Sequence, residues 1–142
     1  KSIYMMEEIN EEECKILKKL TNNYKTQIVA QEFLPDIYDG DFRVLIIHGE
    51  PYKKTLARIP QGGSFKGNLA AGGKGEVRDI SDVQMRIGSV VGEYLMKKDI
   101  NFAGIDIIGQ KLTEINITSP TCAREIFEQS GINPIEDYFK KL

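Results

Sequence analysis

The chain has 142 residues, of which 41% are hydrophobic and 28% charged, with a net charge of -2. These values are typical of one soluble globular domain and exclude a broad basic face of the kind that binds nucleic acid. No apolar stretch reaches the length of a membrane span, and no cleavable leader opens the sequence, so we expect a cytoplasmic protein without a membrane partner. The two cysteines, Cys14 and Cys122, match neither a disulfide framework nor a metal motif.

The first third of the chain opens on "KSIYMMEEI", which lacks an initiator methionine and predicts a short strand over residues 2–6. We interpret this opening as that of a fragment. A helix is predicted over residues 11–20, because Asn10 and Glu13 form a capping-box pattern before apolar residues at helical spacing. A buried strand is predicted over residues 26–34, ended by Pro35.

The segment "FRVLIIHGEPYKKTLAR" predicts two antiparallel strands joined by a turn over residues 48–51. His48 falls in that turn, which favours an exposed turn residue over a general base. Residues 59–75 then lose all periodicity and contain six glycines. Loops of this length usually form lids over a ligand or are disordered. A phosphate-binding P-loop is excluded, because Gly75 stands where that motif requires Ser or Thr.

The remaining sequence predicts a helix over residues 81–98, a second hairpin over 102–118 that turns at 109–111, and two further helices. The first of these begins just after Ser119-Pro120 and ends at Gly131, and the second follows Asn133-Pro134. Because the strands come as hairpins, the predicted class is α+β with an antiparallel sheet.

Three polar side chains interrupt the second hairpin: Asp106, Glu114 and Asn116. Carboxylate and amide oxygens are the ligands that Mg²⁺ prefers. A two-residue turn would pair Ile105 with Glu114, whereas a three-residue turn would pair Asp106 with Glu114 on one face. We predict the three-residue turn. Spacing alone favours a metal site and a merely solvated face about equally.

Two arginines, Arg43 and Arg58, lie one on each strand of the first hairpin, with Asp41 nearby. Ordinary surface ion pairs are the commoner arrangement for such residues. Binding of a carboxylate or phosphate group is the alternative.

Ser119 and Thr121 flank Pro120 where a helix is predicted to begin. That position suits an anion, although ordinary helix capping is the commoner explanation. Cys122 in the first turn of that helix could have a lowered pKa, but no His lies near it in the sequence and we propose no nucleophile.

Three segments, "DGDFRVLIIHGEP", "LARIPQGGSFKGNLAAGGKGE" and "FAGIDIIGQKLTEINITSPTCAREI", together resemble the bacterial-type glutathione synthetases, which are ATP-grasp ligases. The resemblance runs from about residue 30 to residue 125. It implies that residues 1–142 are the C-terminal part of an ATP-grasp domain, an antiparallel sheet with flanking helices. The N-terminal domain and the family's glycine-rich nucleotide loop would be absent, so the fragment alone is expected to be inactive.

The resemblance also implies roles for individual residues. Asp106, Glu114 and Asn116 would hold Mg²⁺ or Mn²⁺, with Asn116 also facing the nucleotide. Arg43 and Arg58 would be catalytic and bind the dipeptide carboxylate and the acyl phosphate. The remaining implied contacts are with ATP, for Gln31, Glu32, Phe33, Leu34 and Asp41, and with substrate, for Asn68, Ser119, Pro120 and Thr121.

The implied reaction is the ATP-dependent joining of γ-glutamylcysteine and glycine through an acyl phosphate, in a homo-oligomeric full-length enzyme. Two alternatives stay open. One is a related ATP-grasp ligase that uses another amino acid, and the other is a non-catalytic module that binds an anion or a protein partner.

Overall fold

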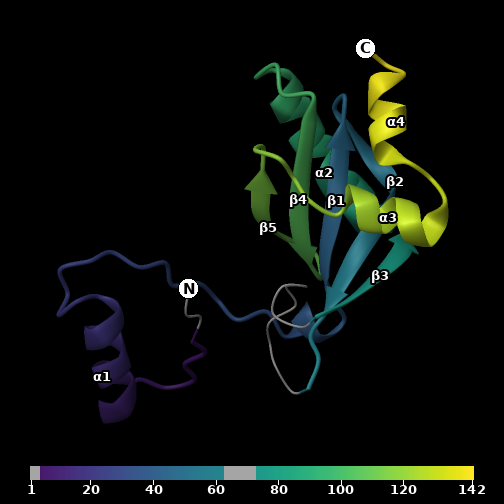
Figure 1. Ribbon diagram of the computed structural model, residues 1–142. Helices are drawn as coiled ribbons and strands as arrows, with labels where there is room; N and C mark the ends of the chain where they lie inside the picture. Colours follow the sequence, from purple (N-terminus) through teal and green to yellow (C-terminus); the bar gives the residue numbers. More distant parts are fainter. Residues whose placement is uncertain (1–3, 63–72) are drawn as a thin grey trace. The chain divides into compact units, whose positions relative to one another are not determined.

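A computed structural model describes residues 4–62 and 73–142 of the chain. The chain divides into two compact units, Lys1–Phe33 and Leu34–Leu142, which are described separately below (Figure 1). Among the described residues, none of the helices has the length and apolar character needed to cross a membrane.

The first unit contains helix α1, Glu11–Leu20. As predicted, Asn10 caps it: the Asn10 side chain accepts hydrogen bonds from the backbone of Glu12 and Glu13, and the Glu13 carboxylate accepts one from the Asn10 backbone. Three glutamates begin the helix and two lysines end it, in the order that the helix dipole favours.

The predicted strand over residues 26–34 is wrong, and so is strand structure at residues 4–6, because both segments are irregular. Val29 is 88% exposed, although its segment "TQIVA" has the composition of a buried strand. A strand forms only when its backbone groups bond to a neighbouring strand. Within residues 4–33 the structure contains no strand that could pair with it.

The second unit is built on one antiparallel sheet, which confirms the predicted α+β class. Within the described residues the strand order is β3-β2-β1-β4-β5. The bounds of its elements are η1 Pro35–Tyr38, β1 Asp41–Ile47, β2 Glu50–Ile59, β3 Lys74–Asp79, α2 Asp82–Met96, β4 Phe102–Ile108, β5 Lys111–Asn116, α3 Ala123–Ser130 and α4 Pro134–Phe139.

The β1–β2 hairpin turns through His48 and Gly49, both of which have positive φ angles, as tight hairpin turns require. The hairpin is as predicted, but His48 is half-buried, not exposed. Its ring stacks on Tyr138 with 4.8 Å between centroids, and its Nε2 atom lies 3.0 Å from the Tyr138 carbonyl oxygen. Packing of α4 against the turn therefore covers this side chain, which sequence distance alone could not show.

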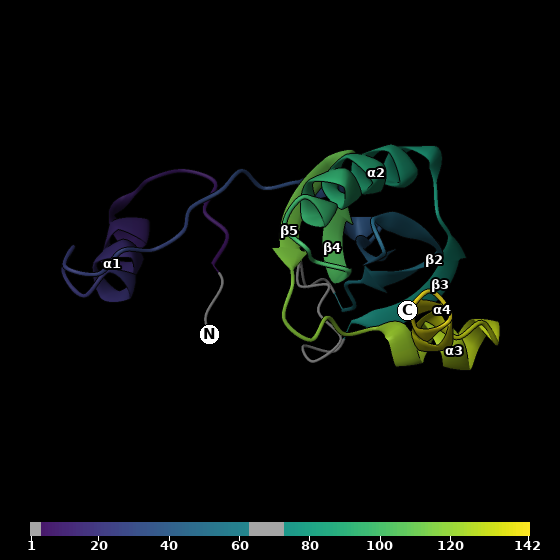
Figure 2. The same ribbon diagram turned by 90° about the horizontal axis from the view of Figure 1, so that it is seen from above.

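Helices cover the two faces of the sheet, and each face has its own apolar core (Figure 2). Val44, Ile46, Ile105 and Ile107 pack with Val91 and Leu95 of α2. On the other face, strand residues pack with α3 and the segment before it: Leu45, Ile47, Tyr52, Leu56, Cys122 and Ile126. This division follows from the alternation of side chains along β1, since residues 44 and 46 face one way and residues 45 and 47 the other.

Strand β3 was not predicted, because the sequence indicated a loop through residue 75. The strand pairs with β2, with Leu56 opposite Val77 and Arg58 opposite Gly75. Its sequence, "KGEVRD", carries four charges and a glycine, so its strand propensity is low. The ladder of hydrogen bonds to β2 stabilises it instead.

Helix α2 was predicted over residues 81–98; Ser81 caps it, and it approaches the β1–β2 turn through Gly88 and Gly92. A Cβ atom placed on Gly92 would lie 1.9 Å from the carbonyl oxygen of Gly49, and one on Gly88 would lie 2.8 Å from the Cβ atom of Pro51. The two glycines are therefore required by contact with the sheet.

We expect Gly92→Ala to lower the free energy of unfolding by about 3 kcal/mol, because a buried backbone contact would have to open. In an exposed helix position the same change would raise stability by about 1 kcal/mol through helix propensity. Urea denaturation of the chain measures the difference. Glu93→Ala, at the next and exposed position of the same helix, is the matched control. Unchanged or increased stability of Gly92→Ala would contradict the close approach.

Candidate active site

A polar cluster lies at the end of the sheet where β1 begins, on the face that also packs against α3. The ends of the strands can be followed in Figure 1. Strand pairing creates it: Arg43 lies opposite Asp106 on β4, and Asp41 lies opposite Arg58 on β2. Arg43, Arg58 and Asp106 have exposed fractions of only 5%, 8% and 3%. The expectation of ordinary surface ion pairs for the two arginines is therefore wrong, because neighbouring strands and the segment before α3 enclose them.

The charged groups form one connected network. Arg43 Nε and Nη2 donate to the two carboxylate oxygens of Asp106 at 2.5 and 2.9 Å. Arg58 Nη2 lies 2.9 Å from Asp106 Oδ1 and 2.5 Å from Asp41 Oδ2. Bidentate pairing of this kind fixes the plane of a guanidinium as well as its position. The network therefore presents two oriented cations at one end of the sheet.

The pKa values of the two aspartates shift in opposite directions, although burial raises both. Burial alone would raise the pKa of Asp106, but hydrogen bonds from Arg43 and the charges of Arg58 and Arg43 hold that pKa below its ordinary value. The pKa of Asp41 is raised by burial, which outweighs the attraction of Arg58. Among the described residues, Asp41 Oδ1 is a buried acceptor that receives no hydrogen bond.

Glu114 lies directly opposite Asp106, as predicted, but by a different route. The β4–β5 turn has two residues, Gly109 and Gln110, since Ile108 pairs with Lys111. A β-bulge then places Glu114 on the same face as Asp106, as predicted. Ile107 pairs with Leu112 and Asp106 with Glu114, so Thr113 is the extra residue. The Thr113 hydroxyl donates to the Asp106 carbonyl oxygen at 3.1 Å. The predicted three-residue turn is therefore wrong, while the pairing that it was meant to explain is confirmed.

Asn116 completes the polar group on β5. In the amide orientation that satisfies both of its ends, its oxygen accepts from Arg43 Nη2 and its nitrogen donates to Glu114 Oε1, each at 3.2 Å. Oxygen atoms of Asp106, Glu114 and Asn116 consequently converge on one region. Within the described residues no group of three or more His, Cys, Asp and Glu side chains could hold a metal ion. The triad has two carboxylates and one amide, a donor set that fits Mg²⁺ with water completing its shell.

Gly104 makes room for this arrangement. A Cβ atom at Gly104 would lie 2.9 Å from the Cδ atom of Arg43 and 2.9 Å from the Cβ atom of Pro120. Sequence reasoning missed this residue, although a glycine within an apolar strand is a signal of close approach. Gly104 therefore belongs to the site, because it seats the side chain of Arg43.

Comparison with known proteins identifies the family. The model of the prokaryotic glutathione synthetase ATP-grasp domain matches residues 1–131. The chain belongs to this family. The glutathione synthetase of Vibrio parahaemolyticus is 49% identical over 125 residues, which are 88% of the chain and 40% of that relative. The glutathione synthetase of Pseudomonas syringae pv. tomato is 52% identical over 118 residues, 83% of the chain and 37% of that relative.

The chain thus spans about two fifths of the length of these glutathione synthetases. Among solved structures, the ATP-grasp ligase PsnB in complex with a precursor peptide and AMPPNP matches 78% of the chain, with a TM-score of 0.51 and 18% identity. This likeness covers 34% of the PsnB chain and shows the ATP-grasp fold.

The segment "SPTC", residues 119–122, leads into helix α3 without a capping hydrogen bond from the side chain of its N-cap residue. Helix α3 begins at Ala123, and its N-cap residue Cys122 makes no capping hydrogen bond from its side chain. Ser119 and Cys122 have positive φ angles of 47° and 87°, which turn the chain sharply on both sides of Pro120. The explanation of Ser119 and Thr121 as ordinary helix caps is therefore wrong.

The lowered pKa considered for Cys122 is also wrong. Burial raises the pKa of its thiol, which packs in the apolar core beside Ile126.

The predicted nucleotide and lid contacts stay predictions. Gln31, Glu32 and Phe33 belong to the first unit, and Leu34 precedes η1 as its N-cap residue in the second. Asn68 lies outside the described residues.

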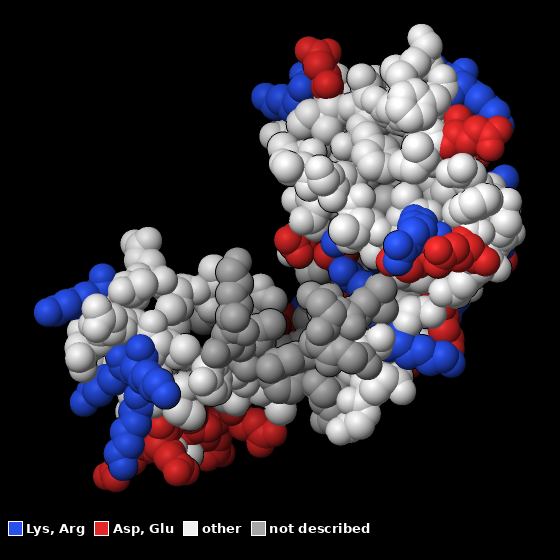
Figure 3. Space-filling view, viewed as in Figure 1, with Lys and Arg blue, Asp and Glu red and all other residues white. Residues whose placement is uncertain are grey.

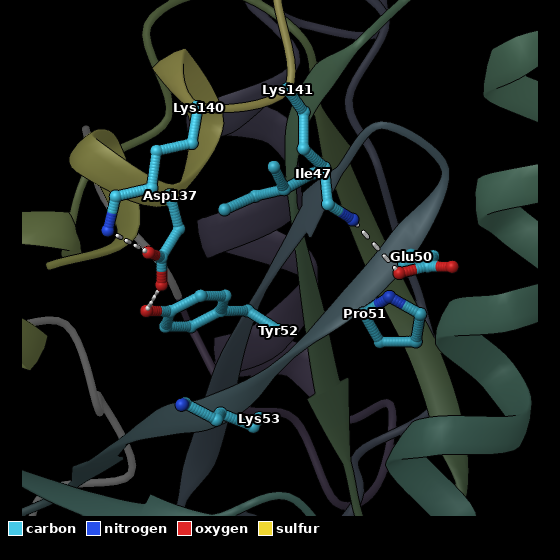
Figure 4. A pocket seen from close by; sticks show the side chains of 8 residues that line it. All are labelled: Ile47, Glu50, Pro51, Tyr52, Lys53, Asp137, Lys140 and Lys141. Carbon is cyan, nitrogen blue, oxygen red and sulfur yellow. Dashed lines mark hydrogen bonds and ion pairs between the residues drawn. The ribbon is translucent and has the colours of Figure 1, made fainter. Parts of the chain in front are cut away.

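A hollow of about 300 Å³ lies near the other end of the sheet, between β2 and α4 (Figure 4). Several of its polar groups bond to one another: Tyr52 donates to Asp137 at 2.7 Å, and Lys141 lies 3.2 Å from Glu50. None of the predicted site residues lines the hollow.

On the face shown in Figure 3, charged side chains of the second unit gather toward its two ends, with a largely uncharged surface between them.

Proposed function

We propose that this chain is the C-terminal part of the ATP-grasp domain of an enzyme that joins γ-glutamylcysteine and glycine, using ATP, to form glutathione. The observation that carries the proposal is the buried Arg43–Asp106–Arg58 network beside Glu114 and Asn116, in a member of the glutathione synthetase family. Formation of an acyl phosphate brings a carboxylate and phosphate groups together. The site supplies oriented cations and metal-binding oxygens for these groups.

Each part of the cluster has a task in this proposal. Arg43 and Arg58 bind the dipeptide carboxylate and the phosphoryl group, and thereby hold the two reacting groups in line. Asp106, Glu114 and Asn116 would hold Mg²⁺, which when bound neutralises charge on the ATP phosphates. Asp41 would contact the nucleotide, as the family relationship implies, and its Oδ2 atom pairs with Arg58. Ser119, Pro120 and Thr121 border the place where the peptide substrate would bind.

The remaining elements of the proposal rest on the family relationship. Gln31, Glu32, Phe33 and Leu34 would contact the adenine, and Asn68 would belong to a lid that excludes water from the acyl phosphate. Mn²⁺ has the same oxygen preference as Mg²⁺ and would replace it. The full-length enzyme would be a cytoplasmic homo-oligomer. The chain alone would not turn over, since the relatives that it matches are more than twice as long.

The test is a condensation assay on the full-length protein with ATP, Mg²⁺, γ-glutamylcysteine and glycine, in which the tripeptide and ADP are both measured. Equal amounts of the two products are expected. The same assay with β-alanine or serine in place of glycine separates the alternatives. Preferential use of another amine would point to a related ligase. Nucleotide binding without turnover of any amine would point to a binding module.

A further inference from the structure

A guanidinium nitrogen lies within the proposed metal site and contacts two of its three ligands. Arg43 Nη2 donates to Asp106 Oδ2 at 2.9 Å and to the amide oxygen of Asn116 at 3.2 Å. The same amide bonds to Glu114 through its nitrogen at 3.2 Å. Arg43 Nη2 therefore lies between two of the three oxygen donors that a metal ion would bridge.

The described contacts leave little room for a second cation there. Asp106 Oδ1 accepts from both Arg43 Nε and Arg58 Nη2, and Asp106 Oδ2 accepts from Arg43 Nη2. The side chains of Arg43 and Asp106 are only 7% and 4% exposed, so solvent screens them weakly. Mg²⁺ binds oxygen at about 2.1 Å, a distance at which it would meet the guanidinium directly.

Arg43, not Arg58, is the group in competition with a metal ion. Arg58 also pairs with Asp41, and this contact would remain if Asp106 were withdrawn. The side-chain contacts described for Arg43 are to Asp106 and Asn116, both of them proposed metal ligands. When a metal ion takes these two residues, the Arg43 charge needs a new anionic partner, because an unpaired charge at a buried position is costly.

We propose that Arg43 is a resident cation of the metal site, which a metal ion displaces only when an anion takes up the Arg43 guanidinium. This inference rests on the proposed function, because it takes Asp106, Glu114 and Asn116 as the metal ligands. Metal and anion then strengthen each other's binding by the same factor, as linkage requires. The site would stay closed to free metal ions and open when phosphate or carboxylate groups arrive.

The test measures Mn²⁺ binding to the 142-residue chain without nucleotide, from the loss of the electron paramagnetic resonance signal of free Mn²⁺. Arg43→Met is expected to lower the Mn²⁺ dissociation constant at least about tenfold, since a positive charge a few ångströms away is removed. Arg78→Met removes the same charge from an exposed position on β3 and is expected to change nothing. Adding Glu114→Gln to Arg43→Met is expected to abolish the gain.

A second arm uses the unaltered chain in potassium sulfate and in potassium chloride of equal ionic strength. Sulfate is expected to tighten Mn²⁺ binding several-fold in this chain and to have no such effect in Arg43→Met. This arm also decides the question if circular dichroism shows that Arg43→Met does not fold.

Two failures are distinguishable. Mn²⁺ binding that depends on Glu114 but is unchanged or weakened by Arg43→Met, or that is indifferent to sulfate in the unaltered chain, would overturn the resident-cation proposal and leave the metal site in place. Mn²⁺ binding that is independent of Glu114 in every variant would overturn both the metal site and the inference built on it.

Discussion

Glu114→Gln is expected to lower the rate of ATP-dependent tripeptide formation by about a hundredfold or more, because it removes a charge that would stabilise the transferring phosphoryl group. Glu114 is exposed on the edge strand β5. Its loss should therefore change the free energy of unfolding by less than about 0.5 kcal/mol. Initial rates at saturating ATP and Mg²⁺, together with urea denaturation of the same samples, test both parts.

Glu93→Gln is the matched control for that experiment, since Glu93 is an exposed glutamate of α2 outside the cluster. Asn116→Ala is expected to slow the reaction as Glu114→Gln does, because it removes a neighbouring oxygen donor. Full activity in both variants would mean that Glu114 and Asn116 are only water-exposed residues at the edge of the sheet, and that the metal ion binds elsewhere.

Arg58→Met is expected to lower the free energy of unfolding by about 3 kcal/mol at pH 7. Breaking a buried ion pair typically costs about 3–5 kcal/mol, and the lower value applies because the Asp41 side chain keeps 20% exposure. Asp41 would lose its described partner, and Asp106 would keep only Arg43. Arg78→Met, on the neighbouring strand, controls for loss of an arginine from an exposed position.

The deficit of Arg58→Met should shrink in acid. Without Arg58, the already raised pKa of folded Asp41 rises further above its ordinary value of 3.8. The folded variant then binds a proton that the unfolded chain has lost, so its stability increases as the pH falls toward about 4. The unaltered chain behaves in the opposite way at Asp106, whose lowered pKa contributes stability that is lost as the pH falls below 3.8.

Urea denaturation of both proteins at pH 7 and pH 4 measures this change. The double variant Arg58→Met with Asp41→Leu should regain part of the loss, because it leaves no unpaired carboxylate. A deficit that is the same at both pH values, or a double variant no more stable than the single one, would show that Asp41 stays solvated when Arg58 is absent.

Local signals were enough to predict most helices and both hairpins. Asn10 and Asn133 cap the helices that they were expected to cap, and Gly131 ends α3. These features depend on residues within four positions of one another. Where structure depends on a distant partner, the sequence misled: residues 26–34 look like a strand without forming one, and β3 forms on β2 despite an unfavourable composition.

The candidate site shows the same limit. The residue types at 106, 114 and 116 suggested a metal-binding group, and the structure brings these residues together. Burial of Arg43 and Arg58 could not be predicted, since it depends on Arg43 pairing with a residue 63 positions away. A glycine within an apolar strand signals a close approach at Gly104, but the groups that it approaches, Arg43 and Pro120, lie on separate segments and could not be named from the sequence.

Because of the bulge at Thr113, the β4–β5 hairpin could differ in length by one residue without its side chains changing face. Since Thr113 pairs with no residue of β4, a chain shorter by that one residue could keep every observed cross-strand pair, including Asp106 with Glu114. A residue added to the tip between Ile108 and Lys111 could likewise be absorbed there, leaving the ladder below unchanged. Relatives that differ by one residue in this hairpin could therefore still carry the same ligands on the same face, so alignments that force a gap-free match here would misplace them.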